Sequence, residues 1–120
     1  MKIIGTGSAH PTCAVTNQML EQFIETTDEW ITERTGIKER CVISSEHLED
    51  MAVHAANKAL EDAGLTAADI DFLICSNVVN EYVTPALSCI IQGKLGAKCP
   101  TVDINAACAG FIYAMDIADD

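Results

Sequence analysis

The chain has 120 residues, the length of one domain. Hydrophobic residues make up 49% of it and charged residues 21%, which is typical of a folded core and excludes a disordered chain. A net charge of −11 argues against nucleic-acid binding, because phosphate contacts need Lys and Arg. The sequence lacks a signal peptide and any apolar run near the about 20 residues of a membrane helix. We therefore expect a soluble, cytoplasmic protein without nucleic-acid or membrane partners.

Residues 2–11 open with a β-like run that breaks at Gly5, Gly7 and Pro11. A dinucleotide-binding fingerprint would need a third glycine where His10 stands. The run therefore predicts a strand and a turn rather than a nucleotide loop.

Two helices are expected next. Thr16 or Asn17 offers an N-cap for a short helix. Thr26 and Glu29 have the spacing of a capping box, which predicts a second helix that ends at Gly36.

The rest of the chain alternates strands and helices. The expected order is a strand at 41–44, a helix at 48–63, a strand at 69–79, a helix opened by Pro85 and closed at Gly96, a strand at 100–107 and a helix at 109–118. Alanines at helical spacing within 48–63 predict close packing against another element. The alternation indicates an α/β fold with a parallel or mixed sheet.

The six cysteines are scattered, and the chain has neither a CxxC pair nor a secretory signal, so no disulfide framework is expected. Cys75 is expected to be buried in a strand and Cys89 in a helix core. His47 and His54 do not make a convincing zinc set. We expect no structural metal.

A basic cluster follows the single tryptophan: Trp30 precedes Arg34, Lys38 and Arg40. On an acidic protein, this pattern indicates an anionic ligand with a flat part. A solvated helix end explains the same residues, because basic side chains favour helix C-termini. The pattern alone leaves both interpretations open.

Cys108 is predicted to lie on a turn between a strand and a helix. Its neighbours Ala106, Ala107, Ala109 and Gly110 are small and would let a substrate carbonyl approach the sulfur. A following helix would point N–H groups and the positive end of its dipole at the thiol, which favours the thiolate and an oxyanion. The alternative is an inert, packed cysteine, since cysteine is commonly buried.

Five stretches in order along the chain resemble the β-ketoacyl-acyl carrier protein synthase III family, which has the thiolase fold. They are "IIGTGS", "TTDEWITERTGIKER", "AANKALEDAG", "QGKLGAK" and "DINAACAGFIYA". The resemblance implies an α/β, thiolase-like layered fold, with residues 1–120 as the N-terminal part of its first βαβαβ half. It also implies a chain that is truncated or cleaved within its last helix, at "IADD".

The resemblance implies an initiating condensation in fatty-acid synthesis. An acyl-CoA primer, acetyl or longer, would be joined to malonyl-acyl carrier protein to give 3-oxoacyl-acyl carrier protein. Cys108 would carry the acyl group as a thioester. Trp30 would stack on the adenine of CoA, Arg34 would meet its nucleotide end, and Thr26 would lie beside the adenine. Acyl-CoA is a substrate here, and no other cofactor is implied.

Two departures from the family pattern matter. The family's catalytic His and Asn have no counterpart in this chain, so we expect the chain alone to be inactive and to need the remainder of the enzyme, as a second chain if it is cleaved. Thr84 stands before Pro85 where well-known members carry phenylalanine. In the family that residue crosses the homodimer interface and lines the partner's acyl pocket, so threonine implies room for branched or longer primers.

The resemblance places the segment 100–106 near the dimer interface and buries the helix that carries Cys108. Poor solubility of the isolated chain is expected for the same reason. Two other functions stay open. One is a related thiolase-fold acyltransferase, and the other is a non-catalytic assembly piece with Cys108 buried.

Overall fold

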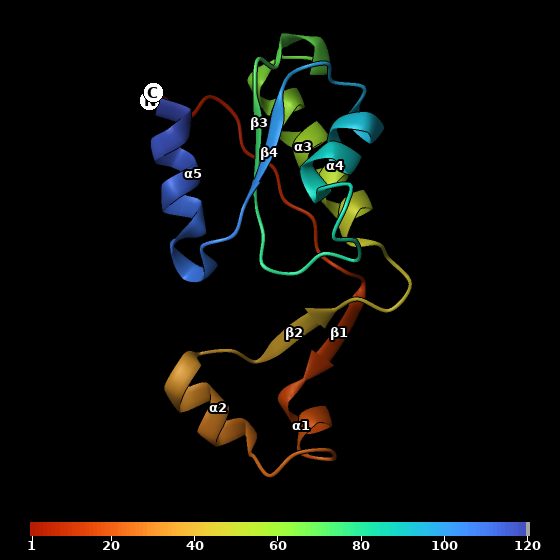
Figure 1. Cartoon of the computed structure of the whole chain (residues 1–120). Helices are drawn as coiled ribbons and strands as arrows, with labels where there is room; N and C mark the ends of the chain where they lie inside the picture. Colours follow the sequence, from red (N-terminus) through yellow and green to blue (C-terminus); the bar gives the residue numbers. More distant parts are fainter. Residues whose placement is uncertain (120) are drawn as a thin grey trace. The chain divides into compact units, whose positions relative to one another are not determined.

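The computed structural model describes residues 1–119, which divide into two compact units (Figure 1). The small unit is His10–His47, and the large unit combines Met1–Ala9 with the chain from Leu48 onward. Each unit has its own strands and helices, so each is described by itself. Among residues 1–119, no helix has both the length and the hydropathy of a membrane span.

The small unit is a two-stranded antiparallel ribbon with two helices. Its elements are β1 (Cys13–Thr16), α1 (Asn17–Leu20), α2 (Asp28–Thr35) and β2 (Glu39–Val42). The Thr16 hydroxyl accepts a hydrogen bond from the Met19 amide and caps α1, as predicted. The strand expected at 41–44 is present, shifted two residues toward the N-terminus.

The N-terminus of α2 differs from the prediction by one residue. Thr27, not Thr26, is the N-cap, and its hydroxyl accepts from the Trp30 amide at 3.1 Å. The capping box of Thr26 and Glu29 is therefore wrong. The predicted end at Gly36 is confirmed, with φ of 71° in the left-handed region that glycine adopts without strain.

The large unit is a parallel β3–β4 pair covered by helices on both faces. Its elements are α3 (Leu48–Ala63), a 3₁₀ turn η1 (Ala67–Asp69), β3 (Leu73–Ser76), α4 (Leu87–Leu95), β4 (Thr101–Ile104), a 3₁₀ turn η2 (Ala107–Ala109) and α5 (Gly110–Asp119). Figure 1 shows α5 on one side of the strands and α3 with α4 on the other. This arrangement confirms the α/β class and the parallel pairing.

The N-terminal segment of the large unit is not a strand, so the β-like run at 2–4 is a wrong prediction. It packs instead on α3 through its glycines. A Cβ on Gly5 would lie 2.3 Å from the Ala59 carbonyl oxygen, and one on Gly7 would lie 2.1 Å from that of Ala55. The alanine face of α3 therefore packs closely against another element, as predicted.

The buried apolar core is small. Its members are Ile31 in the small unit and Leu87, Ile91, Ala97 and Cys99 in the large one. Cys89 is exposed, which contradicts its predicted place in a helix core, because it lies on the face of α4 opposite Leu87 and Ile91. All six cysteines are free thiols.

Helix α5 is not buried within this chain, and its expected burial in the complete enzyme stays a prediction. Phe111 is 65% exposed, Ile112 62% and Tyr113 55%. Its first residue, Gly110, is the one buried member of the helix. An outward apolar face of this size is uncommon on a stable monomer.

Candidate functional site

The structure places Cys108 on a turn between a strand and a helix, as the sequence predicts. Strand β4 ends at Ile104, the turn η2 holds Cys108, and α5 begins at Gly110. The thiol is exposed, so it is open to a reagent within this chain. The turn is closed by a hydrogen bond from the Ala109 amide to the Ala106 carbonyl at 3.0 Å.

The residue before the thiol has a strained backbone. Ala107 has φ of 46°, and it is the one residue other than glycine with positive φ among residues 1–119. An alanine in this region costs about 1 kcal/mol. Sharp, strained turns from a strand into a helix are how α/β-hydrolases present a nucleophile above a sheet. The sequence showed the small residues but not the strain.

Gly110 sets how closely α5 approaches β3. A Cβ at this position would lie 2.4 Å from the Ser76 hydroxyl oxygen, a distance that real side chains do not tolerate. Glycine therefore allows the first turn of α5, and with it Cys108, to lie against the end of β3. The close approach explains why a small residue follows the "ACA" turn.

The sequence did not predict a hydrogen-bond network around the Asp103 carboxylate, which lies on the strand that leads to the turn. Asp103, on β4, accepts hydrogen bonds from the side-chain amides of Asn77 and Asn80 at 2.9 and 3.2 Å. It also accepts from the backbone amides of Leu87 and Ser88 at 3.0 and 2.8 Å. These last two bonds cap α4, whose N-cap residue Ala86 has no capping side chain. No local sequence signal links these residues, because they meet only through strand pairing.

The pKa of Asp103 reflects this network. Partial burial raises the pKa of the carboxyl group, but hydrogen bonds from Ser88, Asn77 and Leu87 outweigh that and hold it below its ordinary value of 3.8. Burial raises the pKa of the neighbouring Cys75 thiol, which an Asn77 hydrogen bond partly offsets. Asp103 is therefore a carboxylate at neutral pH, and Cys75 is a thiol.

Thr84 lies in the loop of residues 77–86, between β3 and α4, and is exposed. The Thr84–Pro85 peptide bond is cis. Around it, Val79 is 74% exposed and Val83 fully exposed. The loop thus presents an apolar surface that nothing in the large unit covers among the residues described.

In the small unit, the predicted CoA contacts come together. The Arg34 guanidinium lies over the Trp30 ring, 4.4 Å from its centroid, as the i, i+4 spacing on α2 allows. Trp30 is 52% exposed, so its ring is accessible to a ligand. Thr26 and Trp30 line one open pocket of about 410 Å³, together with Ile24, Glu25 and Thr27.

A buried asparagine holds α2 in place. Asn17 is fully buried, and its amide nitrogen donates to Asp28 Oδ1 and to the Ile37 carbonyl, each at 2.7 Å. The Asn17 bond, ahead of the Lys38 charge and the Thr32 bond, lowers the pKa of Asp28 below its ordinary value of 3.8. The first turn of the helix that carries Trp30 is thus held by polar contacts to Asn17 in addition to the burial of Ile31.

The basic cluster divides into two roles. Arg34 lies over the tryptophan, whereas Arg40 donates to Asn17 Oδ1 at 3.2 Å and supports the ribbon. Lys38 adds charge beside Asp28. Arg34 is therefore the member of the basic cluster that lies against the tryptophan, and a solvated helix end does not describe Arg40, which lies on β2.

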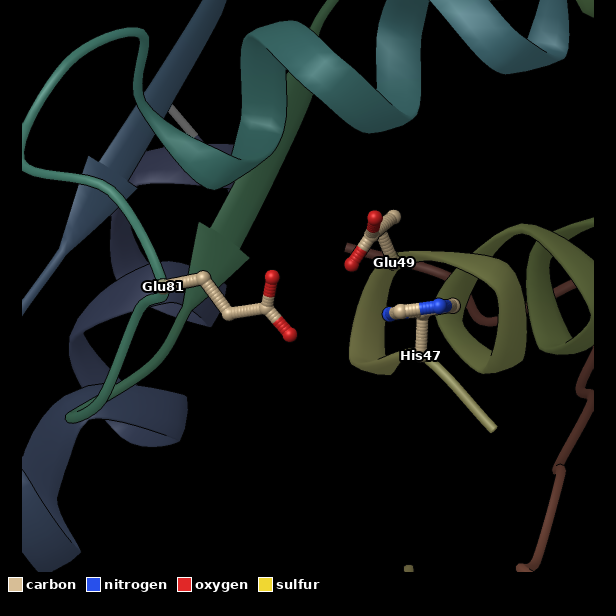
Figure 2. A group of neighbouring side chains, drawn as sticks. All are labelled: His47, Glu49 and Glu81. Carbon is tan, nitrogen blue, oxygen red and sulfur yellow. The ribbon is translucent and has the colours of Figure 1, made fainter. Parts of the chain in front are cut away.

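The large unit also brings two carboxylates together on its surface. Figure 2 shows Glu49, on α3, and Glu81, in the loop after β3, whose carboxylate oxygens lie within 4.8 Å of each other. The Lys94 ammonium lies 3.6 Å from Glu49 Oε1 and compensates its charge. His47, also drawn, belongs to the small unit. Exposed acidic groups are common without an ion, so we assign no metal to them.

A parallel βαβ arrangement with a cysteine at the strand-to-helix turn is what the thiolase fold provides, and the comparisons agree. The chain belongs to the family described as thiolase, N-terminal domain, whose model matches residues 31–120. It is 50% identical, over 117 residues, to the β-ketoacyl-[acyl-carrier-protein] synthase III of Clostridium perfringens (strain SM101 / Type A), covering 97% of this chain and 36% of the relative.

Two solved structures are similar throughout the chain. The 3-oxoacyl-[acyl-carrier-protein] synthase III of Aquifex aeolicus VF5 has a TM-score of 0.94 and 46% identity, covering 98% of this chain and 39% of that one. The priming β-ketosynthase of the R1128 polyketide biosynthetic pathway has a TM-score of 0.92 and 40% identity, covering 98% and 36%. The resemblance to synthase III is confirmed, and the chain spans just over a third of these relatives' length.

Proposed function

We propose that this chain is the N-terminal portion of a β-ketoacyl-acyl carrier protein synthase III. In this proposal it works with the remainder of the enzyme, as a homodimer in the cytoplasm, on acyl-CoA and malonyl-acyl carrier protein. Its membership of the thiolase family and its similarity to two synthases named III support the proposal. The observation that carries it is the exposed Cys108 thiol on the strained turn before α5.

The first step is transfer of the primer to sulfur. The Cys108 thiolate attacks the carbonyl carbon of acyl-CoA, and a tetrahedral oxyanion forms. The C–S bond to CoA then breaks, CoA leaves as a thiol after taking up the proton that Cys108 lost, and the acyl group remains as a thioester on Cys108. In this proposal, backbone N–H groups in the first turn of α5, beyond the Gly110 amide that donates to the Ala107 carbonyl, stabilise negative charge near the sulfur.

The second step joins the acyl group to the extender. Malonyl-acyl carrier protein loses CO₂, and the resulting enolate carbon attacks the Cys108 thioester. A carbon–carbon bond forms, the C–S bond to Cys108 breaks, and 3-oxoacyl-acyl carrier protein is released with the thiolate restored. The His and Asn that the family resemblance requires for decarboxylation lie outside this chain, so the chain alone is expected to be inactive.

In this proposal, the small unit supplies the residues that bind CoA. The exposed Trp30 ring offers a flat surface for adenine, and Arg34 adds a cation for the phosphorylated nucleotide. Thr26 lines the same pocket as Trp30 and lies beside the adenine in this proposal. CoA is bound here as a substrate, and no resident cofactor is proposed.

The test is to locate the acyl group. The enzyme that contains this chain is incubated with acetyl-CoA, and peptide mass spectrometry maps the acylated cysteine. We expect the acyl group on Cys108 in the wild type and in Cys89→Ser, and its loss in Cys108→Ser. Cys89 is the matched control because it is an exposed thiol in the same unit. Acylation of another cysteine, or of none, would overturn the proposal.

Thr84 is proposed to influence which acyl-CoA primer the enzyme accepts. The similarity to a priming β-ketosynthase of polyketide synthesis makes a related acyltransferase with another primer the second candidate. We expect the wild type to accept branched or longer acyl-CoA primers, and Thr84→Phe to narrow the range toward acetyl-CoA. A primer panel measured as kcat/KM tests this. Strict acetyl-CoA preference, unchanged by the substitution, would contradict the role of Thr84.

A further inference from the structure

Asp103 contacts the Thr84 loop at its beginning, its middle and its end. Asn77 opens the loop, Asn80 lies within it, and Leu87 with Ser88 begins the helix that follows it. All four donors converge on one carboxylate, at 2.8 to 3.2 Å. Three of them share Oδ2, and the Ser88 amide takes Oδ1.

The loop has little apolar anchoring of its own. Val78 is 60% exposed, Val79 74%, Tyr82 54% and Val83 fully exposed. The C-terminal end of the network, in contrast, is buried, since Ser88 is fully buried and Leu87 is 6% exposed. The conformation of the loop therefore depends on polar bonds to the strand beside it.

That strand leads directly to the candidate nucleophile. Asp103 is the penultimate residue of β4, and the Asn77 amide donates to the carbonyl of the last one, Ile104, at 3.1 Å. The chain then passes through the turn that holds Cys108. One carboxylate thus ties the loop that carries Thr84 to the strand that leads to Cys108.

We propose that Asp103 is a positioning residue for primer selectivity, which fixes the Thr84 loop on β4 and so holds Thr84 in place where it would line the partner's acyl pocket. This inference rests on the proposed function for the roles of Thr84 and Cys108. Asp103 does not touch the primer. It acts by holding four N–H donors that belong to the loop and to the helix after it.

Asp103→Asn tests this in the enzyme that contains the chain. The substitution keeps the shape but replaces one acceptor oxygen with an NH₂ group, which faces N–H donors and cannot bond to them. We expect the ratio of kcat/KM for acetyl-CoA to that for a branched four-carbon acyl-CoA to move toward unity by about tenfold, the effect of losing one charge-assisted bond. Hydrogen exchange at the Leu87 and Ser88 amides, which donate to Asp103, should become faster.

Two further variants keep the test decisive. Asn80→Ala removes the donor in the middle of the loop and leaves Asp103 with three donors. It should move the primer ratio in the same direction as Asp103→Asn, but by less. If Asp103→Asn does not fold, Asn80→Ala is the variant that tests the inference. Asp69→Asn is the matched control, because that carboxylate accepts from the Thr66 amide and hydroxyl in η1. It should leave the primer ratio and the exchange of the Leu87 and Ser88 amides unchanged.

The outcomes separate this inference from the proposed function. A wild type that does not acylate Cys108 would overturn the proposed function, while faster exchange of the Leu87 and Ser88 amides in Asp103→Asn would still support the hold of Asp103 on the end of the loop. An active wild type whose primer ratio is unchanged in Asp103→Asn, or in Asn80→Ala if the first variant does not fold, would overturn the inference. So would an equal loss of kcat on every primer, since that indicates a merely structural role.

Discussion

At the residue scale, the contact between Gly110 and Ser76 controls how the Cys108 turn meets the sheet. Gly110→Ala would place a Cβ 2.4 Å from the Ser76 hydroxyl oxygen but 3.7 Å from its Cβ. The clash is therefore with one atom. We expect Gly110→Ala to destabilise the enzyme by about 1–3 kcal/mol, the usual range for overpacking, and to slow iodoacetamide labelling of Cys108.

Ser76→Ala supplies the matched second variant, because it removes that oxygen and leaves an ordinary contact. The double variant should regain most of the lost stability and labelling rate. A double-mutant cycle measured by chemical denaturation gives the coupling energy. Additive effects of the two substitutions would show that the close approach does not set the geometry of the turn.

At the element scale, the orientation of α2 depends on one buried side chain. Asn17→Ala removes the donor to Asp28 and to the Ile37 carbonyl, and it leaves Arg40 without this acceptor. We expect a loss of about 2–3 kcal/mol of local stability. Hydrogen exchange in α2 should accelerate, and KM for acyl-CoA should rise with little change in kcat.

The neighbouring Gln18→Ala is the control, because Gln18 is exposed on the same short helix. It should leave both measurements unchanged. Unchanged α2 exchange in Asn17→Ala would contradict the positioning role of Asn17.

Helices whose bounds are set by nearby residues, such as capping residues and glycines, could be predicted from the sequence. Helix α3 followed from the alanine spacing and from Gly64, whose φ of 69° ends it. The start of α2 was placed one residue early because Thr26 and Thr27 are adjacent and either can cap. The conformation of the N-terminal segment is set by its tertiary contacts with α3 rather than by local propensity, so the sequence did not predict it.

The candidate site could be predicted only where one short motif defines it. Cys108 and the Trp30–Arg34 pair lie in short motifs, so residue type and spacing predict where they lie in the fold, while their chemical roles stay predictions. The Asp103 network depends on the parallel register that pairs Cys75 with Asp103. A register of that kind is not visible in either strand alone, and the donors lie 15 to 26 residues away along the chain.

At the scale of the whole molecule, acid should destabilise the fold. Hydrogen bonds from the Thr12 side chain, then from the Thr12 and Ser44 amides, hold the pKa of Glu46 well below its ordinary value of 4.5. The pKa values of Asp28 and Asp103 also lie below their ordinary 3.8. Folded carboxyls with lowered pKa values bind fewer protons than the unfolded chain, so their stabilisation is present above about pH 4.5 and is lost as the pH falls below it.

Urea denaturation between pH 7 and pH 3 measures this effect. The denaturation midpoint should fall with acidity, and Glu46→Gln should flatten that dependence because it removes one titrating group. Thr12→Val should flatten it less, since backbone donors to Glu46 remain. A midpoint in Glu46→Gln that keeps the full pH dependence would contradict the contribution of this carboxylate.

The amount of apolar surface left uncovered predicts how the chain behaves alone. Its buried apolar residues are few, whereas Phe111, Ile112 and Tyr113 on α5 and Ile3 and Ile4 near the N-terminus are all more than half exposed. The chain spans just over a third of its relatives' length, and within it nothing among the described residues covers these faces. The charge of −11 opposes association but does not remove apolar patches of this size.

We therefore expect the 120-residue chain expressed alone to aggregate, and to become soluble when it is co-expressed with a polypeptide that supplies the remaining length of a synthase III. Size-exclusion chromatography with light scattering distinguishes the two states. Phe111→Ser with Ile112→Ser should reduce aggregation of the chain alone but also weaken capture of the second polypeptide, because the same face drives both. A monodisperse monomer that melts cooperatively without a partner would contradict this prediction.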